Sequence, residues 1–234
     1  MKNKFIKVDR VASTAEASAL EALGVGIISV DLDLDARFSD QRTVTADQAA
    51  EIRATLRGAT FAVAIDLTAD PAELVHRARL AGASLIQGLT NAVPQYPVRA
   101  ALRDAGIGIV YAGIEISHDD DPGWVFSAQD GAEDLNAAFY QVDVLPEYQD
   151  SWAFLRDQSP EYENEFQIED LDELAGSRPL IAGLDLRPDN VAEIEHRLSR
   201  VRGLVLTLAD RAVRTDVHFR SFAEAIAVLK AVRT

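Results

Sequence analysis

Short apolar runs alternate with amphipathic stretches along the whole chain, which is the pattern of repeated strand–helix units around a parallel sheet. Each run is rich in Val, Ile, Leu or Ala, as expected of strands buried on both faces. The pattern predicts an α/β fold, a (β/α)8 TIM barrel forming a single domain over 1–234. The eight predicted strands are Phe5–Asp9, Gly26–Asp31, Phe61–Asp66, Ser84–Gln87, Ile107–Ile114, Phe139–Asp143, Leu180–Leu184 and Leu204–Leu208.

A polar stretch that carries several aromatic residues separates the sixth and seventh predicted strands. It covers 146–168, which is long for a loop between a strand and a helix. In a barrel such a loop lies at the C-terminal face, where it can close over a site. A surface loop or an oligomer contact is the alternative.

Composition narrows the possible functions. The chain has no cysteine, so disulfides, thiolate metal sites and a cysteine nucleophile are excluded. With 38 acidic and 23 basic residues the net charge is -15, and we expect no nucleic-acid partner. No apolar run approaches a membrane span and no leader-like segment is present, so we expect a cytoplasmic protein with no membrane partner. We expect a small-molecule substrate. The composition leaves open whether the chain forms a homo-oligomer.

Acidic residues follow most of the predicted strands, and the C-terminal ends of barrel strands share one mouth. Such a ring binds a divalent metal, holds an amine or guanidinium substrate, or supplies protonated acids; helix capping is the structural alternative for each residue. Lys7, Arg10 and Arg42 offset part of the charge. The strand-end residues are Asp9, Asp31, Asp66, Glu115, Asp143 and Asp185, with Gln87 on the fourth strand and Thr207 on the eighth.

Two further acidic stretches do not predict a metal site. Residues 31–35 alternate acidic and apolar side chains, yet the glycine and distal glutamate of a calcium loop are missing. His118 stands beside three aspartates, and we expect the four residues to form a helix-capping and turn cluster, with His118 the best candidate for a neutral-pH proton carrier near the mouth. His76, His196 and His218 are expected at the surface. No phosphate-binding or dinucleotide-binding glycine pattern occurs, so no cofactor is expected.

Several segments, in order and spacing, carry a family resemblance. They are Ile6-Lys7-Val8-Asp9-Arg10 with Glu16-Ala17 and 23–30, Asp40-Gln41-Arg42-Thr43-Val44-Thr45-Ala46-Asp47-Gln48-Ala49, Leu85-Ile86-Gln87-Gly88, and Arg187-Pro188-Asp189-Asn190-Val191. Together they resemble phosphoribosylanthranilate isomerase, the (β/α)8 enzyme of tryptophan biosynthesis, over nearly the full chain.

The resemblance implies site residues. In that family a cysteine ending the first strand is the general base and an aspartate ending the sixth is the general acid, in an Amadori rearrangement that opens a phosphoribosyl ring. Those positions here are Asp9 and Asp143, with Glu147 as an alternative acid. The resemblance further suggests that substrate is positioned by Lys7, Arg42, Gln87, Asp185 and Thr207.

The family's phosphate-binding glycine turns, which follow the seventh and eighth strands, are replaced. These stretches read Gly183-Leu184-Asp185-Leu186 and Thr207-Leu208-Ala209-Asp210, which place negative charge where a phosphate would sit. Our leading hypothesis is therefore a divergent isomerase, or a related lyase, that rearranges a small sugar- or amine-containing substrate by acid–base catalysis. The alternative is a non-catalytic barrel that binds a cation, a metal or a protein partner through an acidic mouth. The unmodified tryptophan-pathway reaction is a third possibility.

Overall fold

The eight predicted strands form one closed parallel barrel in the computed structural model, which describes residues 4–214 and 218–232. Each strand pairs with the next, and the ring closes where β1 pairs with β8. The predicted (β/α)8 fold is confirmed. The strands are β1 Phe5–Asp9, β2 Ile27–Asp31, β3 Thr60–Ile65, β4 Leu85–Gly88, β5 Gly108–Ile116, β6 Ala137–Val144, β7 Leu180–Gly183 and β8 Gly203–Thr207.

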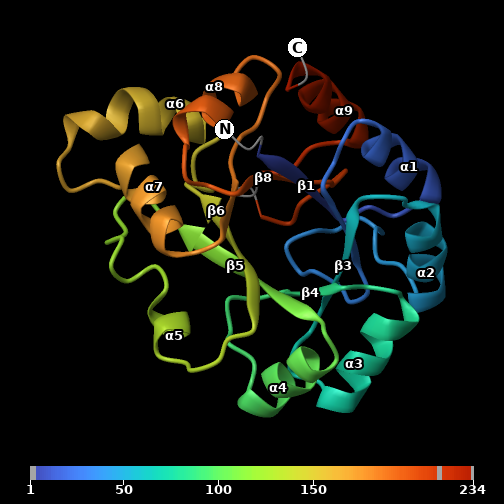
Figure 1. The fold of residues 1–234 in the computed structure, drawn as a ribbon. Coiled ribbons are helices and arrows are strands. Elements are labelled where there is room, and N and C mark those ends of the chain that lie inside the picture. The colour runs from blue at the N-terminus through green and yellow to red at the C-terminus, as the bar shows by residue number, and fades with distance from the viewer. Residues whose placement is uncertain (1–3, 215–217, 233–234) are drawn as a thin grey trace.

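Helices surround the barrel as an outer ring (Figure 1). Capping boxes start α2 and α9, and Asp70 caps α3 immediately before Pro71. The fifth helix is a single turn. The helices are α1 Thr14–Ala22, α2 Ala46–Thr55, α3 Pro71–Leu80, α4 Tyr96–Asp104, α5 Ser127–Asp130, α6 Ser151–Ala153, α7 Ile168–Ser177, α8 Val191–Arg197 and α9 Phe222–Ala231.

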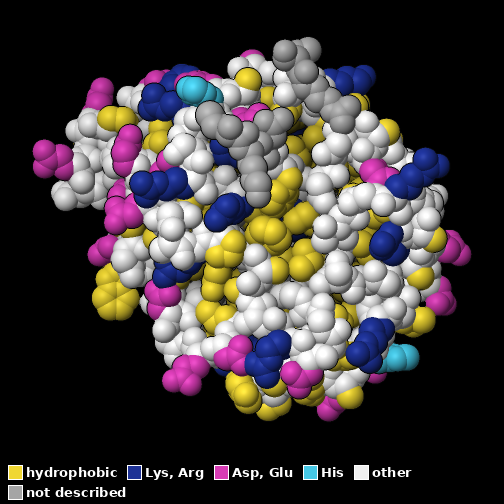
Figure 2. All heavy atoms as spheres, in the orientation of Figure 1, with side chains coloured by type: hydrophobic (Ala, Val, Ile, Leu, Met, Phe, Trp, Pro, Cys, Tyr) yellow, Lys and Arg dark blue, Asp and Glu magenta, His cyan; other side chains and the backbone are white. Residues whose placement is uncertain are grey.

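Apolar side chains fill two regions. The larger core lies between the strands and the helices. The smaller core lies inside the barrel near the starting ends of the strands, where Phe5 packs edge-on against Phe139 at 5.3 Å. In the orientation of Figure 1, hydrophobic side chains gather at the centre of the visible face of the molecule, and charged side chains lie toward its edge (Figure 2). At the starting ends of the strands the barrel interior is therefore a packed apolar core.

The stretch 146–168 is folded rather than extended. After α6 it forms a π turn over Phe154–Gln158 and a 3-10 turn over Ser159–Glu161, and it buries Trp152, Phe154 and Phe166. Among the residues described, no helix is both long and apolar enough to cross a bilayer.

Candidate active site

Lys7 lies inside the barrel directly above the smaller apolar core, and its side chain is completely buried. Its ammonium forms an ion pair with Asp9 and donates to Gln87 Oε1 at 2.6 Å and to Gln141 Oε1 at 2.8 Å. Gln141 Nε2 in turn donates to Asp9 Oδ2 at 2.9 Å. Burial lowers the pKa of Lys7, and the carboxylate of Asp9 opposes that effect. The Lys7 ammonium and the Asp9 carboxylate are thus both paired, which a buried charge requires.

Asp143 stands one layer above, because side chains two residues apart on a strand share a face and Gln141 is its neighbour on β6. Burial raises the pKa of Asp143; Arg37 opposes the rise and Asp9 adds to it. Space for the carboxylate depends on Gly183 of β7, where an added Cβ would lie 2.7 Å from Asp143 Oδ1. A side chain at that position would displace the predicted acid.

Arg37 comes from the loop after β2 and covers Asp143, to whose Oδ2 it donates at 3.1 Å. The other side of its guanidinium holds Asp35 Oδ2 at 2.8 Å. Although burial works in the opposite direction, the two carboxylates hold the pKa of Arg37 above its usual value. Arg37 therefore stays charged and forms a polar cover over the mouth.

A second arginine pairs with the acid at the end of β2. Arg10 Nε donates to Asp31 Oδ2 at 2.9 Å, Nη2 donates to Asp40 Oδ1 at 2.7 Å, and the guanidinium lies 3.8 Å from the centre of the Phe38 ring. Burial raises the pKa of Asp31 to about 6, although Arg10 opposes the rise. Glu115 is likewise paired, with Arg214 at 2.7 Å. The strand-end acids are thus largely matched by cations, which does not favour a free cationic ligand there.

Asp185 is fully buried and its carboxylate binds the protein itself. Its Oδ1 accepts from Ser151 Oγ and from the Trp152 backbone N–H, both at 2.8 Å, and Oδ2 pairs with Arg187 at 3.0 Å. These contacts attach the start of α6 to the end of β7. Substrate contact by Asp185 stays a prediction that this geometry does not favour.

Arg42 also binds the protein. Its Nε donates to the Arg10 carbonyl at 2.7 Å, and Nη2 donates to Glu16 Oε1 at 2.6 Å. Thr207 pairs with Asp9 in the β1–β8 register and so lies at the mouth. The substrate-binding roles predicted for Arg42 and Thr207 stay predictions.

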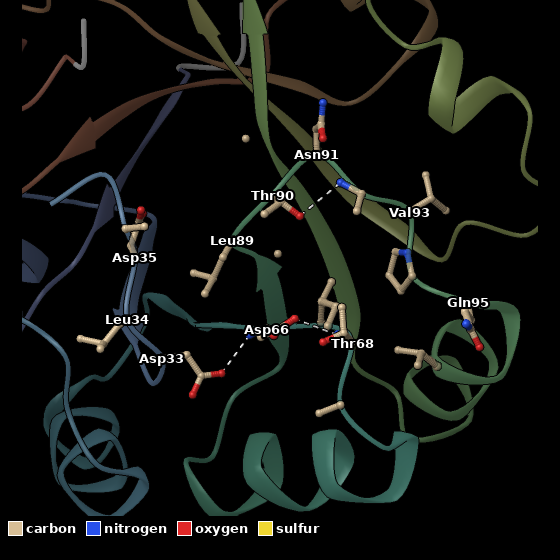
Figure 3. A pocket seen from close by; sticks show the side chains of 18 of the residues that line it. Asp33, Leu34, Asp35, Asp66, Thr68, Leu89, Thr90, Asn91, Val93 and Gln95 are labelled. Carbon is tan, nitrogen blue, oxygen red and sulfur yellow. Dashed lines mark hydrogen bonds between the residues drawn. The ribbon is translucent and has the colours of Figure 1, made fainter. Parts of the chain in front are cut away.

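A cleft of about 1330 Å³ opens beside the mouth, over the ends of β2 to β5. Figure 3 shows the loop after β2, with Leu34, on one side and the chain after β4, with Leu89 and Thr90, on the other. Asp66 lies at the end of β3 on the cleft floor and accepts from the backbone of Thr68. Arg37, Glu115 and Arg214 also line the cleft, so it reaches the residue that covers Asp143.

Two histidines lie near this end of the barrel. His118 faces Glu147, with 3.1 Å between Nδ1 and Oε1, and is exposed. His218, expected at the surface, is instead partly buried, and its Nε2 is 2.9 Å from the Tyr148 carbonyl oxygen. Within the described part of the chain, no cluster of three or more acidic or histidine side chains is arranged to hold a metal ion.

No protein-family model matches the chain, and no curated protein matches it. Solved structures do match. Phosphoribosylanthranilate isomerase from Thermus thermophilus superposes with a TM-score of 0.63 at 16% identity, and the enzyme from Pyrococcus furiosus with 0.65 at 12%; each match covers 98% of both chains.

The chain has the fold of the phosphoribosylanthranilate isomerases. The resemblance suggested by the sequence segments is confirmed at that level. A dihydropteroate synthase from Thermus thermophilus, solved with 4-aminobenzoate, also matches, with a TM-score of 0.53, 13% identity, and coverage of 99% of this chain and 95% of the other. Because barrels of this kind support different chemistries, the reaction has to be argued from the site.

Within this isomerase-like barrel, the structure brings Lys7, Asp9 and Gln87 into direct contact and places Asp143 above them. Gln141 was missed, although its spacing of two from Asp143 could have revealed it. Arg37 and the partly buried His218 were missed because they belong to loops that cross the mouth. No local pattern marks such residues.

Proposed function

We propose that the protein is an acid–base isomerase, in which Asp9 is the general base and Asp143 the general acid for a small polar substrate. The observation that carries this proposal is that two carboxylates face the same interior in unlike surroundings. Asp9 is held by an ammonium and an amide, whereas burial raises the pKa of Asp143. Environments that separate two carboxyl groups in this way suit one to accept a proton and the other to donate one.

The proposed reaction moves two protons. Asp9 takes a proton from a carbon next to a carbonyl or imine carbon, and Asp143 gives its proton to an oxygen of the substrate. This step gives an enol isomer of the substrate, with the protonation states of the two carboxyl groups exchanged. Protonated Asp9, which exchanges its proton with solvent, then gives a proton to the neighbouring carbon while Asp143 takes one from the enol hydroxyl, so the carbonyl isomer forms and both groups are restored. Lys7 stabilises Asp9 as the anion before this step, and Arg37 must move away from Asp143 as substrate enters from the cleft.

The lining of the cleft supports a substrate with hydroxyl or amine groups and an apolar part. Thr68, Thr90 and Asn91 supply polar groups, and Leu34 and Leu89 supply apolar surface. A phosphorylated substrate is disfavoured, because the turn after β7 carries the buried Asp185 and the turn after β8 carries Asp210. A sugar joined to an amine, without phosphate, therefore fits best.

The test is solvent deuterium uptake. The full chain is incubated in D₂O with aldoses, ketoses and N-glycosides of aromatic amines, with and without a 5-phosphate, phosphoribosylanthranilate included. We expect deuterium next to the carbonyl carbon of an isomerised, unphosphorylated product, detected by NMR and mass spectrometry. Asp9→Asn and Asp143→Asn should each reduce the rate about 10²–10⁴-fold. Glu193→Gln, at the outer surface on α8, is the matched control and should leave it unchanged.

Two results would overturn the proposal. One is an activity that survives Asp143→Asn. The other is a panel in which no compound exchanges while some of them raise the melting temperature by binding the folded state, which would favour the non-catalytic barrel.

A further inference from the structure

The loop after β2 and the loop after β8 are joined by a short antiparallel pairing, in which Phe38 lies opposite Ala212. The flanking backbone bonds run from the Val213 N–H to the Arg37 carbonyl, 2.8 Å, and from the Ser39 N–H to the Arg211 carbonyl, 3.3 Å. The two joined segments, 37–39 and 211–214, are called the strap below.

The strap crosses the mouth from one side to the other. Its backbone pairing lies on the side of β1, because β1 stands between β8 and β2 in the closed ring. From there Arg37 reaches Asp143 on β6 at 3.1 Å, and Arg214 reaches Glu115 on β5 at 2.7 Å. In a ring of eight strands β5 lies opposite β1, so the two arginines tie the strap to the far wall of the barrel.

The strap stands between the cleft and the carboxylates of the proposed reaction. Arg37, Arg214 and Glu115 line the cleft, whereas Asp9 and Asp143 do not. Asp9 is only 3% exposed, and the smaller apolar core closes the barrel at the starting ends of the strands. A substrate in the cleft therefore does not reach Asp9 unless Arg37 and Arg214 are displaced.

The two halves of the strap are attached to the protein to different degrees. In the half from the loop after β2, the Phe38 side chain is buried and its ring centre lies 3.8 Å from the Arg10 guanidinium. In the half 211–214, Val213 is 64% exposed and the ion pair with Glu115 is partly exposed. Hydrogen bonds and ion pairs that water can replace each stabilise a structure only a little. We therefore expect 211–214 to be the half that detaches.

We propose that the strap is a gate, in which 211–214 separates from 37–39 and so connects the cleft to the carboxylates, a role that rests on the proposed acid–base function. Opening breaks the backbone pairing and the contact between Arg214 and Glu115. Arg37 then leaves Asp143 to the substrate and keeps Asp35 as its carboxylate partner. Closure over a bound substrate excludes water from the reacting carbon.

Thiol labelling tests the gate without any substrate, because the chain has no cysteine of its own. Ser29→Cys is the reporter inside the barrel. Ser29 is completely buried, its hydroxyl has no hydrogen-bond partner among the residues described, and it faces the interior like Ile27, which lies two positions earlier in the smaller core. In the β1–β2 register it lies level with Asp9. Ala78→Cys, completely buried between α3 and the strands, is the matched control that reports unfolding of the whole chain.

Ser39→Cys together with Arg211→Cys supplies a lock. Both side chains are exposed, and opposite Cα atoms of an antiparallel pair lie about 4.5–5.5 Å apart, which a disulfide can span. The lock is closed by oxidation, and the same chain in its reduced form, freed of reductant, is the control. Peptide mass spectrometry then gives the rate at which iodoacetamide labels position 29 or position 78.

In the reduced chain we expect position 29 to be labelled at least about 10-fold faster than position 78, because the strap opens more often than the whole chain unfolds. Oxidation of the lock should remove this difference. Without the lock, Glu115→Ala, which takes a partner from Arg214, should speed labelling at position 29 alone by about 2–5-fold. Labelling at position 29 that is no faster than at position 78, or whose advantage survives oxidation, would overturn the gate.

The deuterium-uptake assay separates the gate from the chemistry. The locked chain should lose at least about 10-fold in kcat/KM and should recover when the disulfide is reduced. Equal uptake by the locked and reduced chains refutes the gate and leaves the proposed function intact. No uptake by the unlocked chain counts against the proposed function, and the labelling rates then decide the gate by themselves.

Discussion

Replacing Asp31 by Asn should change how stability depends on pH. Burial raises the pKa of Asp31 from 3.8 to about 6 on folding. Between these values the folded chain binds more protons at this site than the unfolded chain, so the free energy of unfolding falls as the pH rises. The two pKa values differ by about two pH units, at about 1.36 kcal/mol each, which gives about 3 kcal/mol in total. About 2 kcal/mol of this falls between pH 4 and pH 7.

Urea unfolding at pH 4, 5, 6, 7 and 8 measures the effect. Asn keeps an oxygen for Arg10 Nε but does not titrate, so Asp31→Asn should gain about 2 kcal/mol relative to the unaltered chain from pH 4 to pH 7. Asp66→Asn, at the exposed end of β3, measures what an acid-to-amide change does at an open strand end. If the free energy of unfolding of Asp31→Asn, relative to the unaltered chain, stayed constant or decreased as the pH rises, burial would not raise the pKa of Asp31 and the reasoning would be refuted.

Three other substitutions test single contacts. Lys7→Met leaves Asp9 buried without its cation and should lower the free energy of unfolding by about 3–5 kcal/mol in urea; adding Asp9→Leu should recover part of the loss, and strict additivity would contradict the pairing. Gly183→Ala should cost about 1–3 kcal/mol and slow deuterium uptake, because its Cβ meets Asp143; an unaffected rate would show that the carboxylate position is not critical. Asp185→Ala should cost about 1–3 kcal/mol and speed limited proteolysis within 146–168, whereas unchanged cleavage would mean that other contacts hold that stretch.

The strands were predictable because a strand that is buried on both faces consists of consecutive apolar residues, which stand out in the sequence. The main departures are at β5 and β6, which are longer than predicted. Their pairing is irregular between Tyr111 and Ile114, where Gly113 has a φ of 72° and the chain after β4 passes so close that an added Cβ would lie 2.9 Å from Thr90. A bulge of this kind depends on a tertiary contact, so hydrophobic periodicity does not reveal it.

The candidate site was predictable only as far as the barrel itself positions residues. Asp9 and Asp143 follow from their places at strand ends, because every strand end faces one mouth. Which acids carry a partner could not be predicted, since Arg37 reaches Asp143 from a loop more than 100 positions away in sequence. His218 was expected at the surface for the same reason: its bond to Tyr148 joins two loops with no shared pattern.

Two departures from the isomerase pattern have one physical explanation. Where the resembled family has a glycine turn after the seventh strand, this chain has Asp185, and the carboxylate binds the first turn of α6 in the unusually long stretch after β6. A glycine there could not form these contacts with Ser151 and Trp152. The carboxylate at the end of β7 is therefore held by contacts within the protein, while the described cleft opens over β2 to β5. Substrate recognition in this barrel should accordingly depend on the loops after β2, β3 and β4, so changes there should alter which compound exchanges deuterium, whereas restoring glycine at 185 alone should not create a phosphate site.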